Sequence, residues 1–346
     1  MRAVVYDEFG GPAAVRDVLE PTPGIHGAVI RVQATGLCRS DWHGWAGHDP
    51  DIALPHVPAH EFAGMVAGVG AAVTRWRPGD RVTAPFVCAC GTCEQCLAGD
   101  HQVCDRQFQP GFDGWGSFAE LVAVDHADVN LVGLPDSLDA VTAASLGCRF
   151  ATAYRAVLAQ GRVGAGQWVA VHGCGGVGLS AVMVAVAAGA RVVAVDVNPA
   201  ALALAAALGS ETTVDAAVTA DVAAAVREAT GGGAHVALDA LGSAQTCLAS
   251  IHSLRKRGRH VQVGLLPPTL AQPVVPMAAV IGRELEIVGS HGLAGHGYAE
   301  MLARVQSGEL RPDLLVAGRI SLDEAGGALA AMGEPGAPAG VTVIVP

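Results

Sequence analysis

The clearest indication of the fold of this chain is the stretch Trp168-Val169-Ala170-Val171-His172-Gly173-Cys174-Gly175-Gly176-Val177-Gly178. Its first five residues have the apolar pattern of a buried strand, and the remainder reads G-x-G-x-x-G before an apolar helical run. Glycine at these positions permits a tight turn, close approach of the backbone to a pyrophosphate, and close packing of helix on strand. The helix N-terminus then faces the phosphates. This context favours a dinucleotide site over a plain glycine-rich turn.

Around this stretch, apolar strands alternate with alanine-rich helical segments, the pattern that predicts βαβ units and a parallel sheet. The expected strands are residues 168–172, 191–196, 235–240, 259–264 and 285–289. The expected helices are residues 176–188, 199–208, 220–230 and 244–254. The short connections between them indicate an open, doubly wound sheet of the Rossmann type.

The parts of the chain on either side have a different texture. Short β-rich runs such as 28–32 and 118–124 lie among glycines and prolines, which predicts an irregular β-rich domain. The last part returns to a mixed pattern and ends in an apolar run, 340–345, that could rejoin the first domain as a strand. We therefore expect a first domain over 1–153, a dinucleotide domain over 154–290, and a return to the first domain over 291–346.

Composition limits the classes of function. Of the 346 residues 51% are apolar and 15% charged, so the chain can bury a large core and is not a disordered protein. A net charge of −11 argues against nucleic acid or an anionic membrane as partner and favours a small-molecule ligand. We interpret the basic run 255–259 as a solvated turn. Charged residues at the start, where a signal peptide needs an apolar region, favour the cytoplasm.

The predicted second strand of the parallel sheet ends in Asp196, 18 residues after Gly178. A carboxylate there would accept hydrogen bonds from the adenosine ribose hydroxyls and would repel a 2′-phosphate. Residues 197–203 contain no lysine or arginine to receive such a phosphate, so the sequence favours NAD over NADP. The alternative is that Asp196 caps the helix that begins at Pro199.

Four thiols recur at metal-ligand spacing in one loop, within residues 88–105. They are Cys90, Cys93, Cys96 and Cys104. Four thiolates suffice for a closed tetrahedral zinc site, which is a structural one because no position remains open. Cys88 lies near enough to compete by spacing alone, and redox or disulfide use of the loop is the alternative.

Three further candidate ligands, Cys38, His60 and Cys148, are far apart in sequence, and their spacing alone would not make them a site. Their neighbours change this assessment, because hydroxyl, imidazole and carboxylate groups stand beside them. These neighbours are Ser40, Asp41, His43 and Glu61. A catalytic zinc needs three protein ligands, one exchangeable position, and acceptors that orient its histidine. Two cysteines and one histidine would meet that requirement.

Four motif blocks, in order over nearly the whole length, resemble the zinc-containing medium-chain alcohol dehydrogenases. The blocks are Cys38-Arg39-Ser40-Asp41-Trp42-His43, Ala59-His60-Glu61, Cys90 to Cys104, and Cys148-Arg149-Phe150-Ala151-Thr152-Ala153-Tyr154. The nucleotide fingerprint follows them, as it does in that family. The resemblance implies a GroES-like catalytic domain beside the Rossmann domain. It also implies that this loop, residues 88–105, is a structural zinc lobe. Its ligands would be Cys90, Cys93, Cys96 and Cys104, without Cys88.

By resemblance, Cys38, His60 and Cys148 hold a catalytic zinc, so the chain is expected to carry two zinc ions. Zinc acts as a Lewis acid that lowers the pKa of a bound alcohol, so that hydride can pass to the nicotinamide. The resemblance further assigns Glu61 as a neighbouring or transient ligand and Asp41 as the group that orients His60.

The resemblance also implies roles for residues that handle the proton and the cofactor. Ser40 would bond the alcohol oxygen and pass its proton through the nicotinamide ribose to His43, whose ordinary pKa of ~6.5 suits that task. Arg39 would contact the pyrophosphate. Thr152 and the stretch Val263-Gly264-Leu265 would line the nicotinamide. The plain alternatives are a loop or capping hydroxyl for Ser40 and a surface histidine for His43.

Two positions depart from the family pattern. Ala59 stands where glycine is usual, which affects the backbone that carries His60 but removes no ligand. Gly340-Val341 stands where Gly-Arg is frequent, so one expected phosphate contact is missing. Arg39, or a residue that the sequence does not identify, would have to supply that positive charge.

The sequence gives the least information about the substrate. Aromatic residues gather between Trp42 and Phe118, and Phe86, Trp42 and Trp115 are candidate pocket residues, with ordinary core packing an equal alternative. We expect an NAD-dependent oxidation of a primary or secondary alcohol. A polyol or amino-alcohol dehydrogenase of the same family, or a catalytically silent nucleotide-binding protein, are the alternatives. The resemblance alone implies a homodimer or homotetramer.

Overall fold

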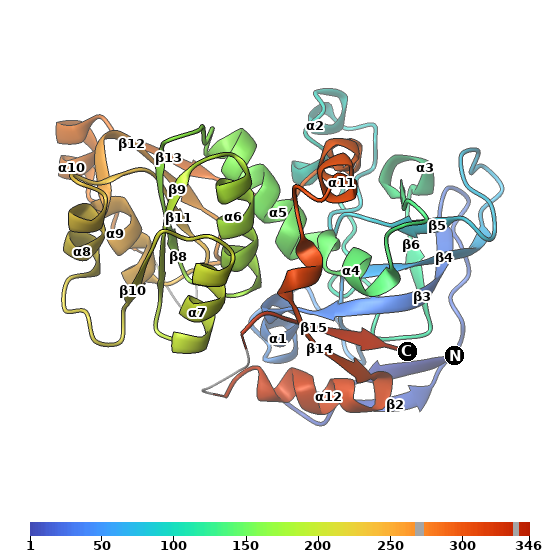
Figure 1. The fold of residues 1–346 in the computed structure, drawn as a ribbon. Coiled ribbons are helices and arrows are strands. Elements are labelled where there is room, and N and C mark those ends of the chain that lie inside the picture. The colour runs from blue at the N-terminus through green and yellow to red at the C-terminus, as the bar shows by residue number, and fades with distance from the viewer. Residues whose placement is uncertain (267–272, 335–338) are drawn as a thin grey trace.

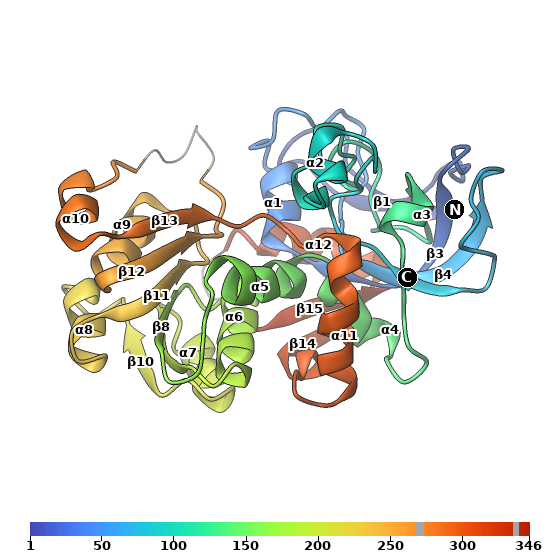
Figure 2. The same cartoon turned by 90° about the horizontal axis from the view of Figure 1, so that it is seen from above.

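Two parts of the molecule lie side by side, one built on a parallel sheet and one rich in antiparallel strands (Figure 1). The computed structural model describes residues 1–266, 273–334 and 339–346. Helices α5 (Ala151–Arg155) and α6 (Gly176–Ala187) lie between the two parts in both views (Figures 1 and 2). Both termini lie in the antiparallel part.

Six strands of the described residues form the parallel sheet. Their order is β10 (Thr212–Asp215), β9 (Arg191–Asp196), β8 (Trp168–His172), β11 (Ala234–Asp239), β12 (Leu254–Gln262) and β13 (Glu286–Gly289). All neighbours are parallel, so the order reverses direction between β8 and β11, the switch point at which doubly wound sheets bind ligands. The predicted Rossmann fold is confirmed.

Alternating side chains on β8 show why this sheet is covered on both faces. Val169 and Val171 pack into the core cluster that contains α6, whereas Trp168 and Ala170 pack into the cluster on the other face. The helices of this part are α6, α7 (Pro199–Ala207), α8 (Val222–Ala229), α9 (Ala244–His252) and α10 (Met277–Arg283). A strand that is buried on both faces has a continuous apolar sequence, and this is the pattern from which β8 was predicted.

Several predicted boundaries differ from the structure for local reasons. The third predicted helix starts later, at Val222, because the Asp221 side chain accepts a hydrogen bond from the Ala224 amide at 2.8 Å and caps it. Strand β10 was not predicted, since its four residues carry little apolar signal. The interpretation of the basic run 255–259 as a turn was wrong. The run lies in β12, whose pairing with β11 is irregular there.

The second part is a mostly antiparallel sheet centred on the long strand β3 (Ala28–Leu37), in which only the described pair β14 (Val316–Ser321) and β15 (Val341–Val345) is parallel. The sheet order is β14, β15, β3, β4 (Phe62–Val69), β5 (Arg81–Thr83) and β7 (Val132–Gly133), and β6 (Leu121–Val124) also pairs with β3. A separate pair joins β1 (Arg2–Val5) and β2 (Ala14–Asp17). The predicted C-terminal strand is confirmed, because β15 pairs antiparallel with β3 and so returns the chain to its first part.

This part also contains several short helices. They are α1 (Arg39–Trp45), α2 (Glu94–Leu97), α3 (Ala127–Asn130), α4 (Ala140–Ala144), α11 (Tyr298–Gln306) and α12 (Leu322–Ala331). The 3-10 turns are η1 (His101–Val103), η4 (Gly295–Gly297) and η5 (Pro312–Leu315), and the π-helical segments are η2 (Leu146–Phe150) and η3 (Ala156–Gln160). The π-helical segment η2 precedes α5 at the boundary between the two parts, a feature that is frequent at functional sites.

Candidate active site and metal centres

A cleft of about 810 Å³ lies between the two parts of the molecule. Its walls include Cys38 and His60 from the antiparallel part and the glycine loop after β8 from the parallel sheet. The candidate zinc ligands and the candidate dinucleotide loop therefore share one cavity, although more than 100 residues separate Cys38 from Gly173 in the sequence.

The three distant ligands converge at the wall of this cleft. Cys38 follows β3, His60 precedes β4, and Cys148 lies in η2. One ligand atom from each, two sulfurs and an imidazole nitrogen, lie within 4.8 Å of one another. Cys38 and His60 are buried and Cys148 is half-buried. This donor set fits a zinc ion that retains an open position toward the cleft.

Asp41 orients the imidazole of this group. Its Oδ1 lies 2.7 Å from Nδ1 of His60, and its Oδ2 accepts a hydrogen bond from the Cys38 amide at 2.8 Å. Because Nδ1 is engaged by a carboxylate, Nε2 is the nitrogen left for a metal. Asp41 is placed by the first turn of α1, which begins directly after Cys38, so the start of this helix brings one candidate ligand together with the group that orients another.

Charges within this buried cluster are strongly coupled. A hydrogen bond from Cys148 and the proximity of His60 outweigh burial and hold the pKa of Cys38 well below its ordinary value. Burial opposes the charge on His60, but Asp41 and Cys38 together raise its pKa well above the usual range. The hydrogen bond with Cys38, together with burial, raises the pKa of Cys148 well above its ordinary value. A thiolate is the form that binds zinc.

Glu61 lies behind these ligands and not in the cleft. Its carboxylate pairs with the buried Arg149 guanidinium and accepts hydrogen bonds from the amides of Cys148 at 3.1 Å and Arg149 at 2.7 Å. It therefore fixes the backbone of η2, from which Cys148 projects. The ion pair between Glu61 and Arg149 was not predicted from the sequence.

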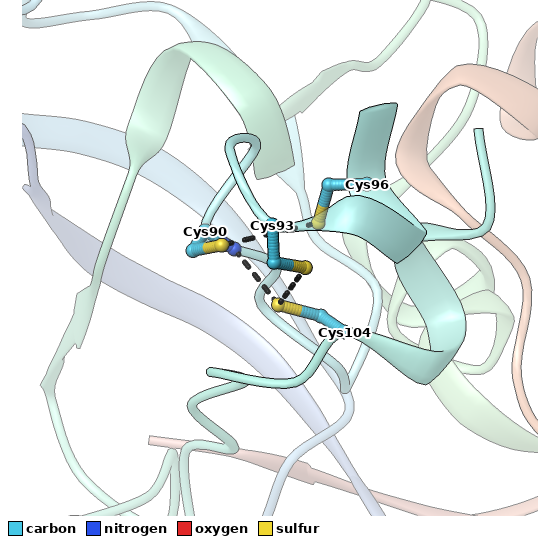
Figure 3. A group of neighbouring side chains, drawn as sticks. All are labelled: Cys90, Cys93, Cys96 and Cys104. Carbon is cyan, nitrogen blue, oxygen red and sulfur yellow. Dashed lines mark hydrogen bonds between the residues drawn. The ribbon is translucent and has the colours of Figure 1, made fainter. Parts of the chain in front are cut away.

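The four lobe cysteines form a second, separate cluster (Figure 3). Their sulfur atoms lie within 4.8 Å of one another, and Cys90 Sγ and Cys96 Sγ are 4.0 Å apart. Desolvation opposes ionisation of Cys90, but donors from Thr92 and the Arg106 guanidinium lower its pKa to about 5. The Cys104 sulfur accepts from the Cys90 and Arg106 amides, each at 3.3 Å. Four ligands with such N–H···S bonds suit a closed structural zinc site.

Cys88, the fifth thiol near the lobe, points elsewhere. Its Sγ donates to the Pro85 carbonyl at 3.7 Å, and it packs among apolar side chains such as Phe62 and Val82. Burial raises its pKa far above that of a free thiol. Cys88 is thus a core residue, and the geometry supports the four-cysteine set without it.

The glycine loop has the conformation that the fingerprint requires. Gly173 has φ of +92°, and a Cβ at Gly178 would lie 1.7 Å from the Gly173 carbonyl oxygen, so neither position accepts a side chain without a shift. A Cβ at Gly175 would meet nothing, because that residue faces the cleft. Gly173, Gly175, Gly176 and Val177 line the cleft, whereas Gly178 packs α6 against β8.

Asp196 stands at the end of β9 and lines the same cleft. Its Oδ2 accepts from the Cys174 amide at 2.5 Å and its Oδ1 from the Asn198 amide at 2.8 Å. The cap of α7 is Asn198, which accepts from the Ala200 amide at 2.9 Å, so the alternative role of Asp196 as that cap is not what the structure shows. The carboxylate instead joins the glycine loop to the end of the neighbouring strand.

Two buried hydroxyls on the cleft wall have no hydrogen-bond partner among the described residues. They are Thr152 Oγ1 and Ser290 Oγ. Buried polar atoms without partners are costly unless a ligand satisfies them, so both favour a polar ligand at this end of the cleft. Val263, Gly264 and Leu265 line the cleft as well. Ser290 was not predicted as a site residue, because nothing in the sequence distinguishes a serine after a strand that lines a cleft from any other serine.

The candidate proton-handling residues also lie on the cleft wall. Ser40 and His43 line it, and Nδ1 of His43 is 2.8 Å from Nδ1 of His48. Burial, then His48 and Arg39, lowers the pKa of His43 below its ordinary value. The sequence did not indicate His48. Arg39 lines the cleft, stacks over Trp42, and donates to the Met332 carbonyl at 2.5 Å.

Of the three predicted pocket aromatics, Phe86 alone lines the cleft. Its ring contacts those of His60 and His291, with centroids 6.0 and 5.1 Å away. Trp42 packs in an apolar core cluster, and Trp115 is 40% exposed and donates to the Pro55 carbonyl. Phe112, which was not predicted, lines the cleft near His60.

Comparison with known proteins defines the class of this molecule. The model of the alcohol dehydrogenase GroES-like domain matches residues 24–136, and that of the zinc-binding dehydrogenase domain matches residues 176–307. The alcohol dehydrogenase of Moraxella sp. (strain TAE123) is 35% identical over 308 residues, which cover 86% of this chain and 89% of that protein. The chain belongs to the zinc-containing medium-chain alcohol dehydrogenase family.

Solved structures of similar proteins agree over the full length. The alcohol dehydrogenase TADH from Thermus sp. ATN1 has a TM-score of 0.90 at 34% identity, covering 100% of this chain and 99% of its own. An NAD-dependent alcohol dehydrogenase has a TM-score of 0.88 at 32% identity, with 100% of both chains covered. The oxidoreductase class thus follows from both sequence and fold. No helix among the described residues is both long and apolar enough to span a membrane.

Proposed function

We propose that this protein is an NAD-dependent zinc alcohol dehydrogenase that interconverts a primary or secondary alcohol with its aldehyde or ketone. One observation carries the proposal: Cys38, His60 and Cys148 converge within 4.8 Å on the wall of the cleft that the glycine loop also lines. A silent nucleotide-binding protein would have no need of a buried, oriented ligand set beside its nucleotide loop.

The two clusters fit two zinc ions with different tasks. A zinc ion held by Cys38, His60 and Cys148 supplies Lewis acidity that makes the alcohol proton easier to lose. Asp41 holds the His60 ring in the required orientation, and Glu61 fixes the backbone that presents Cys148. The ion held by the four lobe cysteines would have a structural role, because no ligand position remains open there.

The proton leaves through side chains of this chain. Ser40 and His43 both line the cleft, and the alcohol proton would pass from Ser40 through the nicotinamide ribose to His43, whose pKa burial lowers. His43 faces His48 at 2.8 Å, so the proton has a second imidazole on its way outward. The role of Ser40 as a hydroxyl that bonds the substrate rests on the family.

Cofactor choice follows from Asp196. Its carboxylate lines the cleft at the end of β9, where ribose hydroxyls would donate to it and a 2′-phosphate would be repelled. The unpartnered Thr152 hydroxyl and residues Val263 to Leu265 line the same cleft as the cluster of Cys38, His60 and Cys148, which supports their assignment to the nicotinamide. These features support NAD over NADP.

Initial rates over a panel of primary and secondary alcohols, followed by NADH absorbance, test the proposal. Activity should require NAD, disappear after removal of zinc with a chelator, and return on addition of zinc. A zinc-free protein of full activity, or a protein inactive towards every alcohol and carbonyl compound of the panel, would contradict it.

A polyol or amino-alcohol substrate is a second candidate, and polar groups on the cleft wall favour it. Besides Ser290, these include His291, whose Nδ1 must donate to the Gln102 carbonyl at 2.9 Å, because a carbonyl only accepts. Nε2 of His291, which has no hydrogen-bond partner among the described residues, is then left to accept from a second hydroxyl or an ammonium group. Diols should outperform matched monools in kcat/KM if this candidate is right, and His291→Phe should remove that advantage.

A homodimer or homotetramer remains our proposal for the assembly. Edge strand β13 and helix α10 expose Met277, Ile281 and Ile287 to 55, 75 and 40%. An exposed apolar face beside a sheet edge with which no other described strand pairs supports association of two copies. Light scattering after size-exclusion chromatography should give at least twice the mass of one chain.

A further inference from the structure

Arg149, the residue after the ligand Cys148, has its guanidinium almost completely buried. It is 6% exposed, and it lines the cleft. Two of its three nitrogens are accounted for, since Nη2 pairs with Glu61 and Nη1 donates to the Leu37 carbonyl at 2.8 Å. The remaining nitrogen, Nε, is buried and has no hydrogen-bond partner among the described residues.

The unpartnered nitrogen lies beside the start of α6. A Cβ built on Gly176, the first residue of that helix, would be 2.5 Å from Cδ and 3.4 Å from Nε of Arg149. The arginine side chain therefore occupies the space that any other residue at position 176 would fill. Gly176 is needed here to let a cation reach the helix terminus, in addition to its role in the turn.

Two independent features at this point attract an anion. Helix α6 has twelve residues, and no side chain caps its N-terminus, so its first amide groups and its dipole favour negative charge. The free Nε–H of Arg149 is a charged donor next to the same terminus, and a charge-assisted hydrogen bond to phosphate is among the stronger ones. Leaving that donor unpaired in a buried place would be costly.

The segment around position 341, whose neighbours Gly340 and Thr342 line the cleft, lacks the positive charge that the family resemblance leads us to expect. Val341, where arginine is frequent, is 2% exposed and packs in the apolar core. Arg39 is the other arginine on the cleft wall among the described residues, and it is exposed and bonded to the Met332 carbonyl.

We propose that Arg149 binds the cofactor phosphates through Nε and so supplies, from the helix that carries Cys148, the charge missing at position 341. The proposal rests on the proposed function, because it takes the dinucleotide as the anion. Arg149 then has two charged partners, Glu61 behind the catalytic cluster and the pyrophosphate in the cleft, in addition to the Leu37 carbonyl. A purely structural arginine would have the first partner only.

Equilibrium binding separates these two roles. Arg149→Met alone would leave the Glu61 charge buried and unpaired, so the informative comparison is Glu61→Gln/Arg149→Met against Glu61→Gln. Glutamine keeps an oxygen for the amides of Cys148 and Arg149. NADH fluorescence and calorimetry with ADP-ribose and adenosine give the affinities, and circular dichroism and melting curves show that both variants are folded.

The double variant should bind NADH and ADP-ribose about 10- to 100-fold more weakly than Glu61→Gln, the range of one charged hydrogen bond. Adenosine, which has no phosphate, should bind both equally. Equal NADH affinities, or an equal loss for adenosine, would overturn the assignment of Arg149 while leaving the proposed function intact. A wild-type chain that binds no NADH at all would instead refute the proposed function.

A second measurement needs no substitution. In the ¹⁵N-labelled wild-type protein, the Arg149 Nε–H resonance should shift and exchange more slowly with solvent when ADP-ribose is added, and should stay unchanged with adenosine. A resonance that ignores ADP-ribose at saturation would show that Nε does not face the phosphates.

Discussion

The two cysteine clusters differ in how the chain assembles them. The lobe takes four ligands from a single loop of 15 residues, Cys90 to Cys104, so its geometry depends on local turns. The proposed catalytic cluster takes its three candidate ligands from the residue after β3, the segment before β4, and η2, and 110 positions separate the first from the last. Only the correctly folded molecule brings them together.

The residues around the two clusters also differ. Around the lobe, backbone amides and Arg106 donate to the sulfurs, and no position is open. Around the catalytic cluster, carboxylates hold the ligands from behind, while a cleft lies in front. A closed cluster can stabilise a fold, whereas a site for chemistry needs an open side and a second layer of residues that orient its ligands.

The largest effect should come from the catalytic cluster. Cys38→Ala removes a ligand, and because the metal contributes several kcal/mol to the transition state, kcat/KM should fall at least ~10³-fold. NADH affinity should change little, since the glycine loop is untouched. Initial rates and NADH fluorescence measure the two. Full activity of the variant would show that no catalytic metal depends on Cys38.

Replacing a lobe cysteine should give the reverse pattern. Cys93→Ala opens the closed cluster, so the melting temperature should fall by roughly 5–10 °C, while kcat of the folded fraction stays within a few-fold of wild type. Differential scanning calorimetry and rates well below the melting temperature give both numbers. Loss of activity without loss of stability would mean that the lobe has a part in the reaction.

Cofactor preference is next in size. Asp196→Ala removes the carboxylate that would repel a 2′-phosphate, so the ratio of kcat/KM for NAD to that for NADP should fall about 10- to 100-fold. Asp196→Asn is the matched control, because it keeps an acceptor for the Cys174 amide without the charge. An unchanged ratio in both variants would contradict the ribose assignment.

A buried histidine of the parallel sheet, His172 in β8, should make the stability of the protein depend on pH. Burial, with His260 nearby, lowers the pKa of His172 to about 3. The unfolded chain takes up a proton near pH 6.5 and the native chain does not, so stability is full above that pH and is lost as the pH falls from 6.5 toward 3. Between pH 7 and pH 5 the loss is about 2 kcal/mol. Urea unfolding should show a shallower slope for His172→Gln, and identical slopes would refute this assignment.

The smallest effect is expected at Ala59, which has φ of +87° directly before His60. An alanine in this region costs roughly 1–2 kcal/mol, and glycine relieves that strain. The variant Ala59→Gly also loses a buried methyl group and gains freedom in the unfolded chain, which offsets most of the gain. The free energy of unfolding should change by less than about 1 kcal/mol. A loss above ~2 kcal/mol would show that the position is not strained.

The sequence predicted what is encoded locally. The glycine loop, the strands β8 and β9, and the four-cysteine lobe follow from spacing and periodicity, and the structure contains them at those residues. Cys38, His60 and Cys148 were named through a family resemblance, since their separation conceals them from spacing alone. Strand β10 and the basic start of β12 were missed or misread because sheet pairing, not local pattern, determines them.

The features missed in the site are contacts between distant segments. Arg149 with Glu61, His43 with His48, and His291 with the Gln102 carbonyl join side chains that only the fold brings together. One signal could have indicated the first of these. An arginine directly after Cys148, in a chain that lacks the usual arginine at position 341, was visible in the sequence as a displaced charge.

The most direct test of the central claim is the zinc content of purified Cys38→Ala compared with the wild-type chain, by mass spectrometry under native conditions. We expect two zinc ions per wild-type chain and one in the variant, retained by the four lobe cysteines. A wild-type chain with a single zinc ion, or a variant that still holds two, would contradict the assignment of Cys38, His60 and Cys148 as a metal site.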